Sequence, residues 1–128
     1  MSLLLDTCSL LWFLSNDSKL SAAARAAIEE TANLRWVSPG SLFEIAIKVR
    51  LGKLTLAAPF AAIFPAKLSA ADIHLLPLES HHIEPLTTLP FHHRDPFDRL
   101  IAATALVEGL TLVSADTAFD AYGVTRLW

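Results

Sequence analysis

The sequence has little of several residue types, and each shortage excludes a class of protein. Its 128 residues include one cysteine, Cys8, which rules out an internal disulfide and a zinc site built on thiolates. No apolar run approaches the roughly 20 residues that a membrane-spanning helix needs. Ten lysines and arginines stand against thirteen acids, so the net charge is −3. A protein that holds nucleic acid through a general excess of positive charge is therefore excluded.

Apolar side chains, in contrast, are abundant. Hydrophobic residues make up 53% of the chain and the mean hydropathy is +0.45, which is high for a soluble protein. The apolar segment from Leu3 to Leu14 is interrupted by Asp6 and Thr7 and follows no basic region, unlike a signal peptide. We expect one cytoplasmic domain over residues 1–128, not associated with a membrane, that buries apolar surface against a partner.

Short apolar segments alternate with helical segments along the whole chain. Because the apolar segments lack a polar face, they indicate a parallel sheet with helices on both sides, an α/β fold. In such sheets ligands bind beyond the carboxyl ends of the strands. Strands are expected at 3–5, 34–38, 73–78, 111–114 and 124–127, and helices at 10–14, 21–31, 40–50, 79–86 and 96–109, with a helical stretch at 57–71 broken by two prolines and a helical turn at 118–122.

Four carboxylates fall at one edge of this expected sheet. Asp6 and Asp116 end the first and fourth strands. Asp98 lies in the first turn of the helix before the fourth strand, and Glu44 lies among apolar residues in the helix after the second. Each has a simpler explanation, because the aspartates suit helix starts and Glu44 could pair with Lys48 four residues later.

Together, however, four carboxylates would repel one another and raise their pKa values, a conflict that bound divalent cations remove. Oxygen ligands without cysteine indicate one or two Mg²⁺ or Mn²⁺ ions rather than Zn²⁺. Such a centre can hydrolyse phosphodiesters, and its cations would supply the positive charge that the composition lacks.

A second aspartate precedes the third acid. Asp95 stands before Pro96, which is typical of a helix cap followed by proline at the first helical position. We interpret Asp95 as the cap and an outer-shell acid, and Asp98 as the metal ligand. The alternative is a capping box in which Asp98 only reaches back to the start of the helix.

Four segments carry these acids: Leu-Leu-Leu-Asp6-Thr7, Ser41-Leu-Phe-Glu44-Ile-Ala-Ile-Lys48, Asp95-Pro-Phe-Asp98-Arg-Leu-Ile-Ala-Ala and Leu-Val-Ser114-Ala-Asp116. In order and spacing they resemble the PIN-domain nucleases, and more closely the VapC-type toxins of bacterial toxin–antitoxin pairs. The resemblance covers essentially the whole chain and implies a three-layer α/β/α sandwich with a mainly parallel central sheet. It implies an endoribonuclease dependent on Mg²⁺ or Mn²⁺, with its metal-site acids at Asp6, Glu44, Asp98 and Asp116. It also implies a homodimer that a small VapB-like antitoxin neutralises.

Neighbouring residues are candidates for supporting roles. Thr7 and Ser114 could hold a carboxylate or a metal-bound water, or only bond within their own turns. Possible RNA contacts, with solvated surface charge as the alternative, are Lys48, Arg99, His93 and Arg94. A candidate groove for an antitoxin segment, with packing inside the domain as the alternative, is formed by Leu11, Trp12, Phe13, Leu56, Phe60 and Phe64.

Three other functions stay open on the sequence. An RNA-processing PIN-like nuclease that is not a toxin would carry the same acids. A binding module could hold a cation without catalysis. A phosphatase with Asp6 as its nucleophile would need a second aspartate two positions later, where Cys8 stands.

Overall fold

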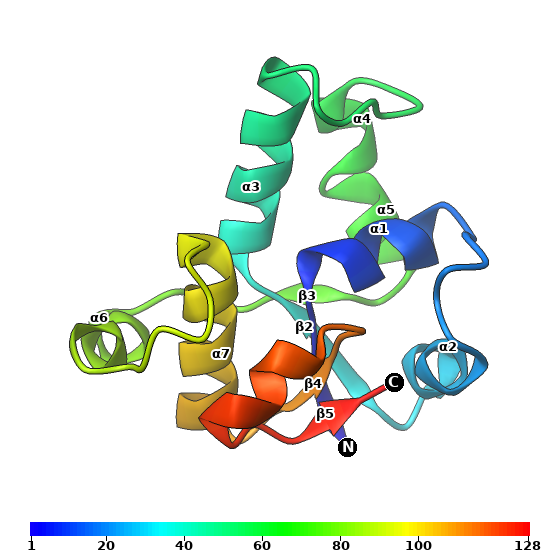
Figure 1. Ribbon diagram of the computed structural model, residues 1–128. Helices are drawn as coiled ribbons and strands as arrows, with labels where there is room; N and C mark the ends of the chain where they lie inside the picture. Colours follow the sequence, from blue (N-terminus) through cyan, green and yellow to red (C-terminus); the bar gives the residue numbers. More distant parts are fainter.

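A five-stranded sheet forms the centre of the computed structural model, which describes residues 1–128 (Figure 1). The strands are β1 (Ser2–Leu5), β2 (Leu34–Val37), β3 (His74–Leu75), β4 (Thr111–Val113) and β5 (Arg126–Leu127). Their order is β3-β2-β1-β4-β5, and every neighbouring pair is parallel. The predicted α/β class with a parallel sheet is therefore confirmed.

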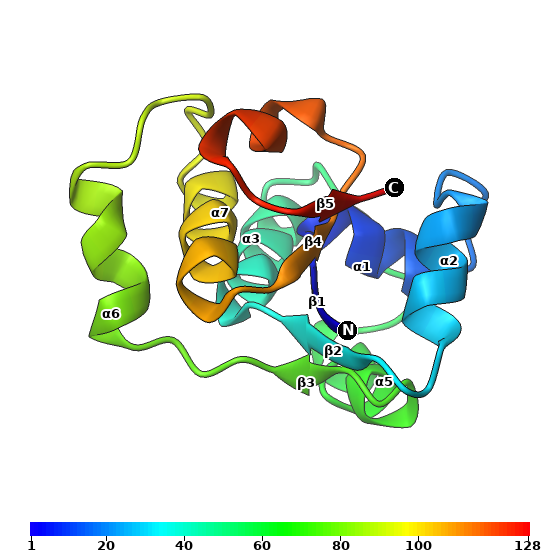
Figure 2. The ribbon, with the colours of Figure 1, turned by 90° about the horizontal axis from the view of Figure 1, so that it is seen from below.

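Helices connect the strands and cover both faces of the sheet. They are α1 (Thr7–Leu14), α2 (Ala22–Glu29), α3 (Pro39–Arg50), α4 (Phe60–Ile63), α5 (Ala66–Ala70), α6 (Ser80–Ile83) and α7 (Pro96–Glu108), with 3-10 helices η1 (Glu84–Thr87) and η2 (Thr117–Tyr122). Figure 2 shows α6 and α7 on one side of the strands and α1 and α2 on the other. None of these helices has the length and apolar character needed to cross a bilayer.

The central strand β1 explains this layering. Leu3, Leu4 and Leu5 are fully buried, and successive side chains of a strand point to opposite faces. Leu3 and Leu5 belong to one core with residues of α1, α2, α4 and α5. Leu4 belongs to a second core with residues of α7 and η2. A strand without a polar face is thus buried between two helical layers.

The element boundaries differ from the predictions where polar caps and prolines act. Helix α1 begins at Thr7 rather than at Leu10, because the side chain of Asp6 caps it directly after β1. Strand β3 is shorter than the predicted 73–78, since Pro77 has no N–H to offer the sheet. The predicted final strand likewise contracts to two residues.

The two stretches that contain prolines are broken, as a ring without an N–H requires. Helices α4 and α5 follow Pro59 and Pro65, so the stretch predicted to be interrupted forms two short helices. The single helix predicted at 79–86 is instead α6 followed by η1, which has Pro85 in its first turn.

Candidate metal centre

The carboxyl edge of the sheet gathers side chains from three elements. Because β1 and β4 are parallel neighbours, Asp6 and Asp116 follow their strands at the same edge. Helix α7 begins there as well, with Asp95 as its cap and Asp98 in its first turn. One Asp98 oxygen, one Asp116 oxygen and a ring nitrogen of His93 lie within 4.8 Å of one another, close enough to share a metal ion.

Asp6 is buried at the end of β1. One of its oxygens, Oδ1, accepts a hydrogen bond from the N–H of Ser9 at 2.8 Å, which confirms that it caps α1. Burial raises the pKa of Asp6, against the opposing effect of hydrogen bonds from Ser114 and Ser9. The carboxylate form is therefore short of stabilising positive charge.

Asp95 and Asp98 have separate roles at the start of α7. The Oδ1 atom of Asp95 accepts from the N–H of Phe97 at 2.8 Å, so Asp95 caps the helix and Asp98 takes no part in the cap. Burial raises the pKa of Asp98 to about 6, and the charge of Asp95 adds to the rise. His93 nearby opposes the rise, and the charges of Glu44 and Asp6 add smaller contributions to it. Asp95, Glu44 and Asp6 thus act on Asp98 in the direction that the sequence predicts.

Asp116 is the most exposed of the four acids. Its Oδ1 accepts from the N–H of Ala118 at 2.9 Å, which caps η2, and its Oδ2 lies 2.7 Å from Nε2 of His93. Burial raises the pKa of Asp116, but the hydrogen bonds from His93 and Ala118 outweigh that effect and lower it. The N–H of Asp116 in turn donates to Oγ of Ser114, so Ser114 touches both this turn and Asp6.

Glu44 is buried on α3 and already has two partners. Its Oε1 accepts from the hydroxyl of Thr7 at 2.7 Å, and its Oε2 pairs with Nζ of Lys48 at 2.6 Å. This hydrogen bond with Glu44 raises the pKa of Lys48. The ion pair considered from the sequence is therefore present, and Thr7 holds a carboxylate. Glu44 lies outside the tight group of His93, Asp98 and Asp116.

His93 is placed differently from the surface contact that the sequence suggested. Its side chain is only 9% exposed. Its ring is parallel to that of Tyr122, with centroids 5.5 Å apart, and also packs on Phe119. Nδ1 lies 3.0 Å from the Tyr122 hydroxyl. His93 is thus a fixed member of the centre; nothing in the sequence distinguished it from its neighbour His92.

The proposed RNA contact at Arg99 needs correction. Arg99 is buried, and its guanidinium donates to the carbonyl oxygens of Pro90 and Leu89 at 2.9 and 3.0 Å. The ring of Phe91 covers it at 4.0 Å. The charge of Arg99 therefore holds the loop before α7 instead of facing solvent.

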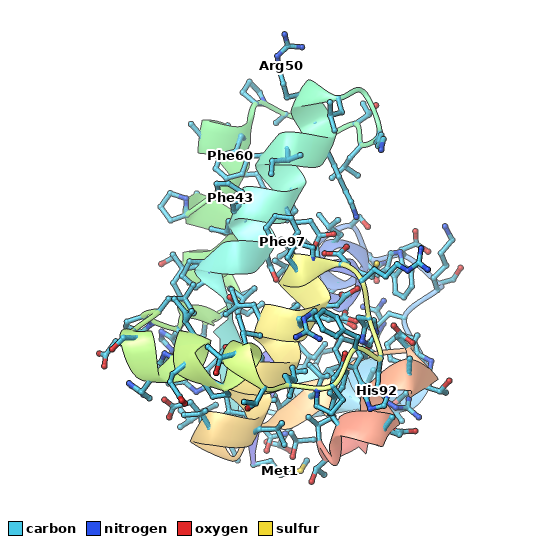
Figure 3. All side chains as sticks on the ribbon, turned by 60° about the vertical axis from the view of Figure 1, so that its left-hand side comes forward. Met1, Phe43, Arg50, Phe60, His92 and Phe97 are labelled. Carbon is cyan, nitrogen blue, oxygen red and sulfur yellow. The ribbon has the colours of Figure 1, made fainter.

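An open hollow of about 390 Å³ lies beside the acids, and three cations line it. They are Lys48, Lys53 and Arg94, and they share this hollow with Glu44 and Asp95 among others. At its border lie the rings of Phe43 on α3 and Phe97 on α7 (Figure 3), and their centroids are 5.6 Å apart. The hollow thus combines positive charge with exposed aromatic surface next to the carboxylates.

A larger apolar groove of about 530 Å³ lies on the α1 side of the molecule. Leu11, Trp12, Leu56 and Phe64 line it, as predicted. Phe13 and Phe60 do not line it, although both pack against the same core.

The donor set fits a divalent cation. Three aspartates from three elements meet at one edge, and burial has raised the pKa of two of them. A cation bound by Asp98 and Asp116, with Asp6 adjacent, would remove this mutual repulsion. Carboxylate oxygens are the ligands that Mg²⁺ and Mn²⁺ prefer.

Comparison with known proteins gives a family match and similar folds. The model of the PIN domain family matches residues 3–124. The structure is similar to VapBC2 from Rickettsia felis bound to a promoter DNA fragment, with a TM-score of 0.73, 16% identity and coverage of 99% of this chain and 98% of that one. It is also similar to VapBC-1 from nontypeable Haemophilus influenzae, with a TM-score of 0.66, 17% identity and coverage of 99% of this chain and 97% of that one. For FitAcB from Neisseria gonorrhoeae the TM-score is 0.53 and the identity 20%, and the match covers 98% of this chain and 96% of that one. At such identities these structures show a common fold, and no match is found among curated proteins.

Proposed function

The chain belongs to the PIN-domain family, and from that premise we propose that it is an endoribonuclease dependent on Mg²⁺ or Mn²⁺. The observation that carries the proposal is the meeting of Asp6, Asp98 and Asp116 at one edge of the sheet. Each of them comes from a different element, and the carboxylates of Asp6 and Asp98 lack enough positive charge nearby to offset their burial. One or two divalent ions suit this deficit.

The residues of the centre have different proposed roles. Asp98 and Asp116 would hold an ion, with Asp6 beside them, and Ser114 keeps Asp6 and the Asp116 turn in place. Glu44, held by Thr7 and Lys48, adds negative charge at the rim. When bound, the metal activates water and stabilises the leaving oxygen in phosphodiester hydrolysis.

The hollow beside the acids is the proposed path of the RNA strand. Lys53 and Arg94 can neutralise phosphates there, and Lys48 can do so while it pairs with Glu44. Unpaired bases can stack on the exposed ring of Phe43. This arrangement supports a single strand as substrate, since a local patch replaces the general positive charge that the chain lacks.

We further propose that the protein is a VapC-type toxin that a VapB-like antitoxin neutralises. Two of the similar structures are described as VapBC proteins, and both are matched over nearly their whole chains. The apolar groove lined by Leu11, Trp12, Leu56 and Phe64 offers a site for a helix or extended segment of the antitoxin. A homodimer within such a complex is part of the same proposal.

The test is cleavage of a mixed RNA pool by the purified protein with Mg²⁺ or Mn²⁺, compared with EDTA. Asp98→Asn should abolish cleavage because it removes a ligand charge, and Glu29→Gln, on the exposed face of α2, should leave it unchanged. Circular dichroism establishes that both variants are folded. Wild-type cleavage by folded Asp98→Asn would refute the assignment of the centre. Metal binding without any cleavage would instead favour a binding module, and phosphate trapped on Asp6 a phosphatase.

A further inference from the structure

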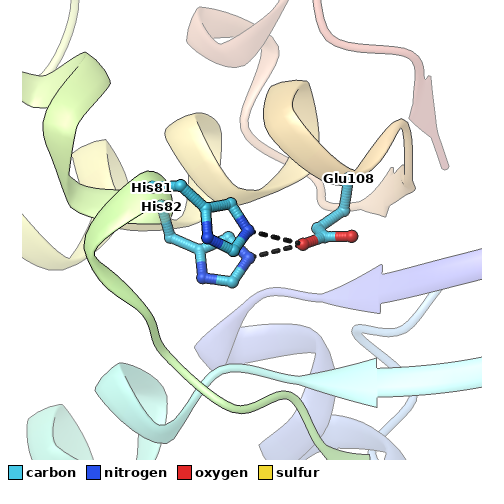
Figure 4. Close-up of side chains that lie close together, drawn as sticks. All are labelled: His81, His82 and Glu108. Atoms are coloured by element: carbon cyan, nitrogen blue, oxygen red, sulfur yellow. Dashed lines mark hydrogen bonds and ion pairs between the residues drawn. The ribbon is translucent and has the colours of Figure 1, made fainter.

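Two groups of histidine and acidic side chains bring three possible ligand atoms within 4.8 Å of one another. One is His93, Asp98 and Asp116, at the carboxyl edge of the sheet. The other joins His81 and His82 of α6 to Glu108 of α7, as Figure 4 shows. The hydrogen-bond partner of each histidine's second ring nitrogen decides which group can bind a metal.

In the group on α6, the proton of His82 is in the wrong place for a metal ligand. Nδ1 of His82 accepts from the backbone N–H of Glu79 at 3.0 Å. A backbone N–H can only donate, so the proton of the neutral ring lies on Nε2, and this N–H donates a hydrogen bond to Glu108. A metal on Nε2 would move the proton to Nδ1, and the hydrogen bond from the N–H of Glu79 to Nδ1 would then break. Nδ1 of His81 lies 3.3 Å from Oε2 of Glu79, which does not prevent ligation, but without His82 the group keeps only two of its three ligand atoms. The group therefore serves to connect α6 to α7.

In the group at the sheet edge, the second nitrogen of His93 has a partner that can change its role. Nδ1 lies 3.0 Å from the hydroxyl of Tyr122, and a hydroxyl can either donate or accept. With Nδ1 protonated, the Tyr122 oxygen accepts, and Nε2 offers its lone pair without the loss of that hydrogen bond. Ligating histidines generally have such a partner on their second nitrogen.

The geometry around Nε2 also suits a shared ion. The ring is held by Tyr122 and Phe119, and Nε2 lies 2.7 Å from Oδ2 of Asp116. Neighbouring ligand atoms on an ion with bonds of about 2.1 Å lie about 3 Å apart. A widening of a few tenths of an ångström therefore accommodates a metal between these atoms.

We propose that Nε2 of His93 binds the same ion as Asp98 and Asp116, which makes the centre selective for Mn²⁺ and similar transition metals over Mg²⁺. The inference rests on the proposed metal-dependent nuclease and adds a nitrogen ligand to its acids. Mg²⁺ favours oxygen ligands and holds its waters tightly, whereas first-row transition metals accept imidazole. His93 thereby decides which ion the carboxylates hold.

The decisive measurement is the pulsed EPR spectrum of Mn²⁺ bound to the purified full-length chain. A directly bound imidazole gives a ¹⁴N coupling in this spectrum, which carboxylates and water do not. We expect that coupling in the wild type, its loss in His93→Gln, and its persistence in the matched variant His92→Gln. The wild-type spectrum requires no substitution, so its outcome is independent of how a variant folds.

Affinity gives the second readout. His93→Gln should weaken Mn²⁺ binding about tenfold or more and leave Mg²⁺ binding nearly unchanged. Bound Mn²⁺ without ¹⁴N coupling in the wild type would overturn the inference, and so would coupling that survives in His93→Gln but is lost in His82→Gln. RNA cleavage without the coupling would refute the nitrogen ligand alone. The coupling without RNA cleavage would instead refute the proposed nuclease.

Discussion

Replacement of Asp98 by asparagine should make the metal-free protein more stable at neutral pH while it abolishes cleavage. The pKa of Asp98 is raised from 3.8 to about 6, chiefly by burial and then by the charge of Asp95. A carboxyl group whose pKa is higher in the folded than in the unfolded state destabilises the fold above the folded pKa, and has no such effect below the unfolded pKa. The penalty therefore develops between about pH 4 and pH 6.

The size of the effect follows from the same values. At about 1.4 kcal/mol for each pKa unit, the rise corresponds to about 3 kcal/mol of free energy of unfolding. Asp98 is only partly buried and solvent screens its charge, so we expect about half of that, about 1.5 kcal/mol. Loss of the favourable charge at the start of α7 subtracts about 0.5 kcal/mol. Asp98→Asn should thus gain about 1 kcal/mol at pH 7.5.

Urea unfolding in EDTA, from pH 4 to pH 8, measures this difference. The wild type and Asp98→Asn should be equally stable near pH 4 and diverge as the pH rises. Added Mn²⁺ should then stabilise the wild type more than the variant, because only the wild type has the full ligand set. A variant less stable than the wild type at pH 7.5 in EDTA, or a difference that does not change with pH, would refute the reasoning.

Two further predictions concern the residues that position the centre. A Cβ atom added at Gly40 would lie 2.9 Å from Cδ2 of Leu100, the end of a flexible side chain that can shift, so Gly40→Ala should cost no more than about 1 kcal/mol in urea unfolding, and Leu100→Ala should lower that cost in the double variant. An unchanged cost in the double variant would mean that this contact is not the cause. Arg99→Met should free the carbonyls of Pro90 and Leu89 and loosen the loop that carries His93, which lowers RNA cleavage; full cleavage together with unchanged hydrogen exchange in that loop would contradict this role.

The fold and the carboxylate edge were predictable because they depend on local rules. Leu3, Leu4 and Leu5 leave no polar face, which indicates a buried parallel strand, and the structure confirms it. Asp95 stands directly before a predicted helix and caps it as expected, whereas Asp6 caps a helix that begins earlier than predicted. The match of the PIN-domain family over residues 3–124 confirms the resemblance that rested on four short segments.

The remaining features depend on how loops return across the molecule. His93 reaches Asp116, 23 positions away, because of the path of the loop before α7. Arg99 has the composition and position of a surface cation, but carbonyl groups of that same loop accept its hydrogens. Neither contact lies within a helix or a strand, so neither leaves a periodic pattern in the sequence. No sequence pattern therefore distinguishes His93 from His92, or a buried arginine from an exposed one.

The central position of β1 has a consequence during synthesis of the protein. This first strand acquires its neighbour β4 only when Thr111–Val113 have left the ribosome, more than 100 residues later. The carbonyl of Val113 accepts from the N–H of Asp6 and the hydroxyl of Ser9, so the start of α1 is also completed then. A nascent chain consequently contains no complete centre. For a proposed ribonuclease, RNA near the ribosome, including its own message, is therefore safe from the nascent chain until β4 has joined β1.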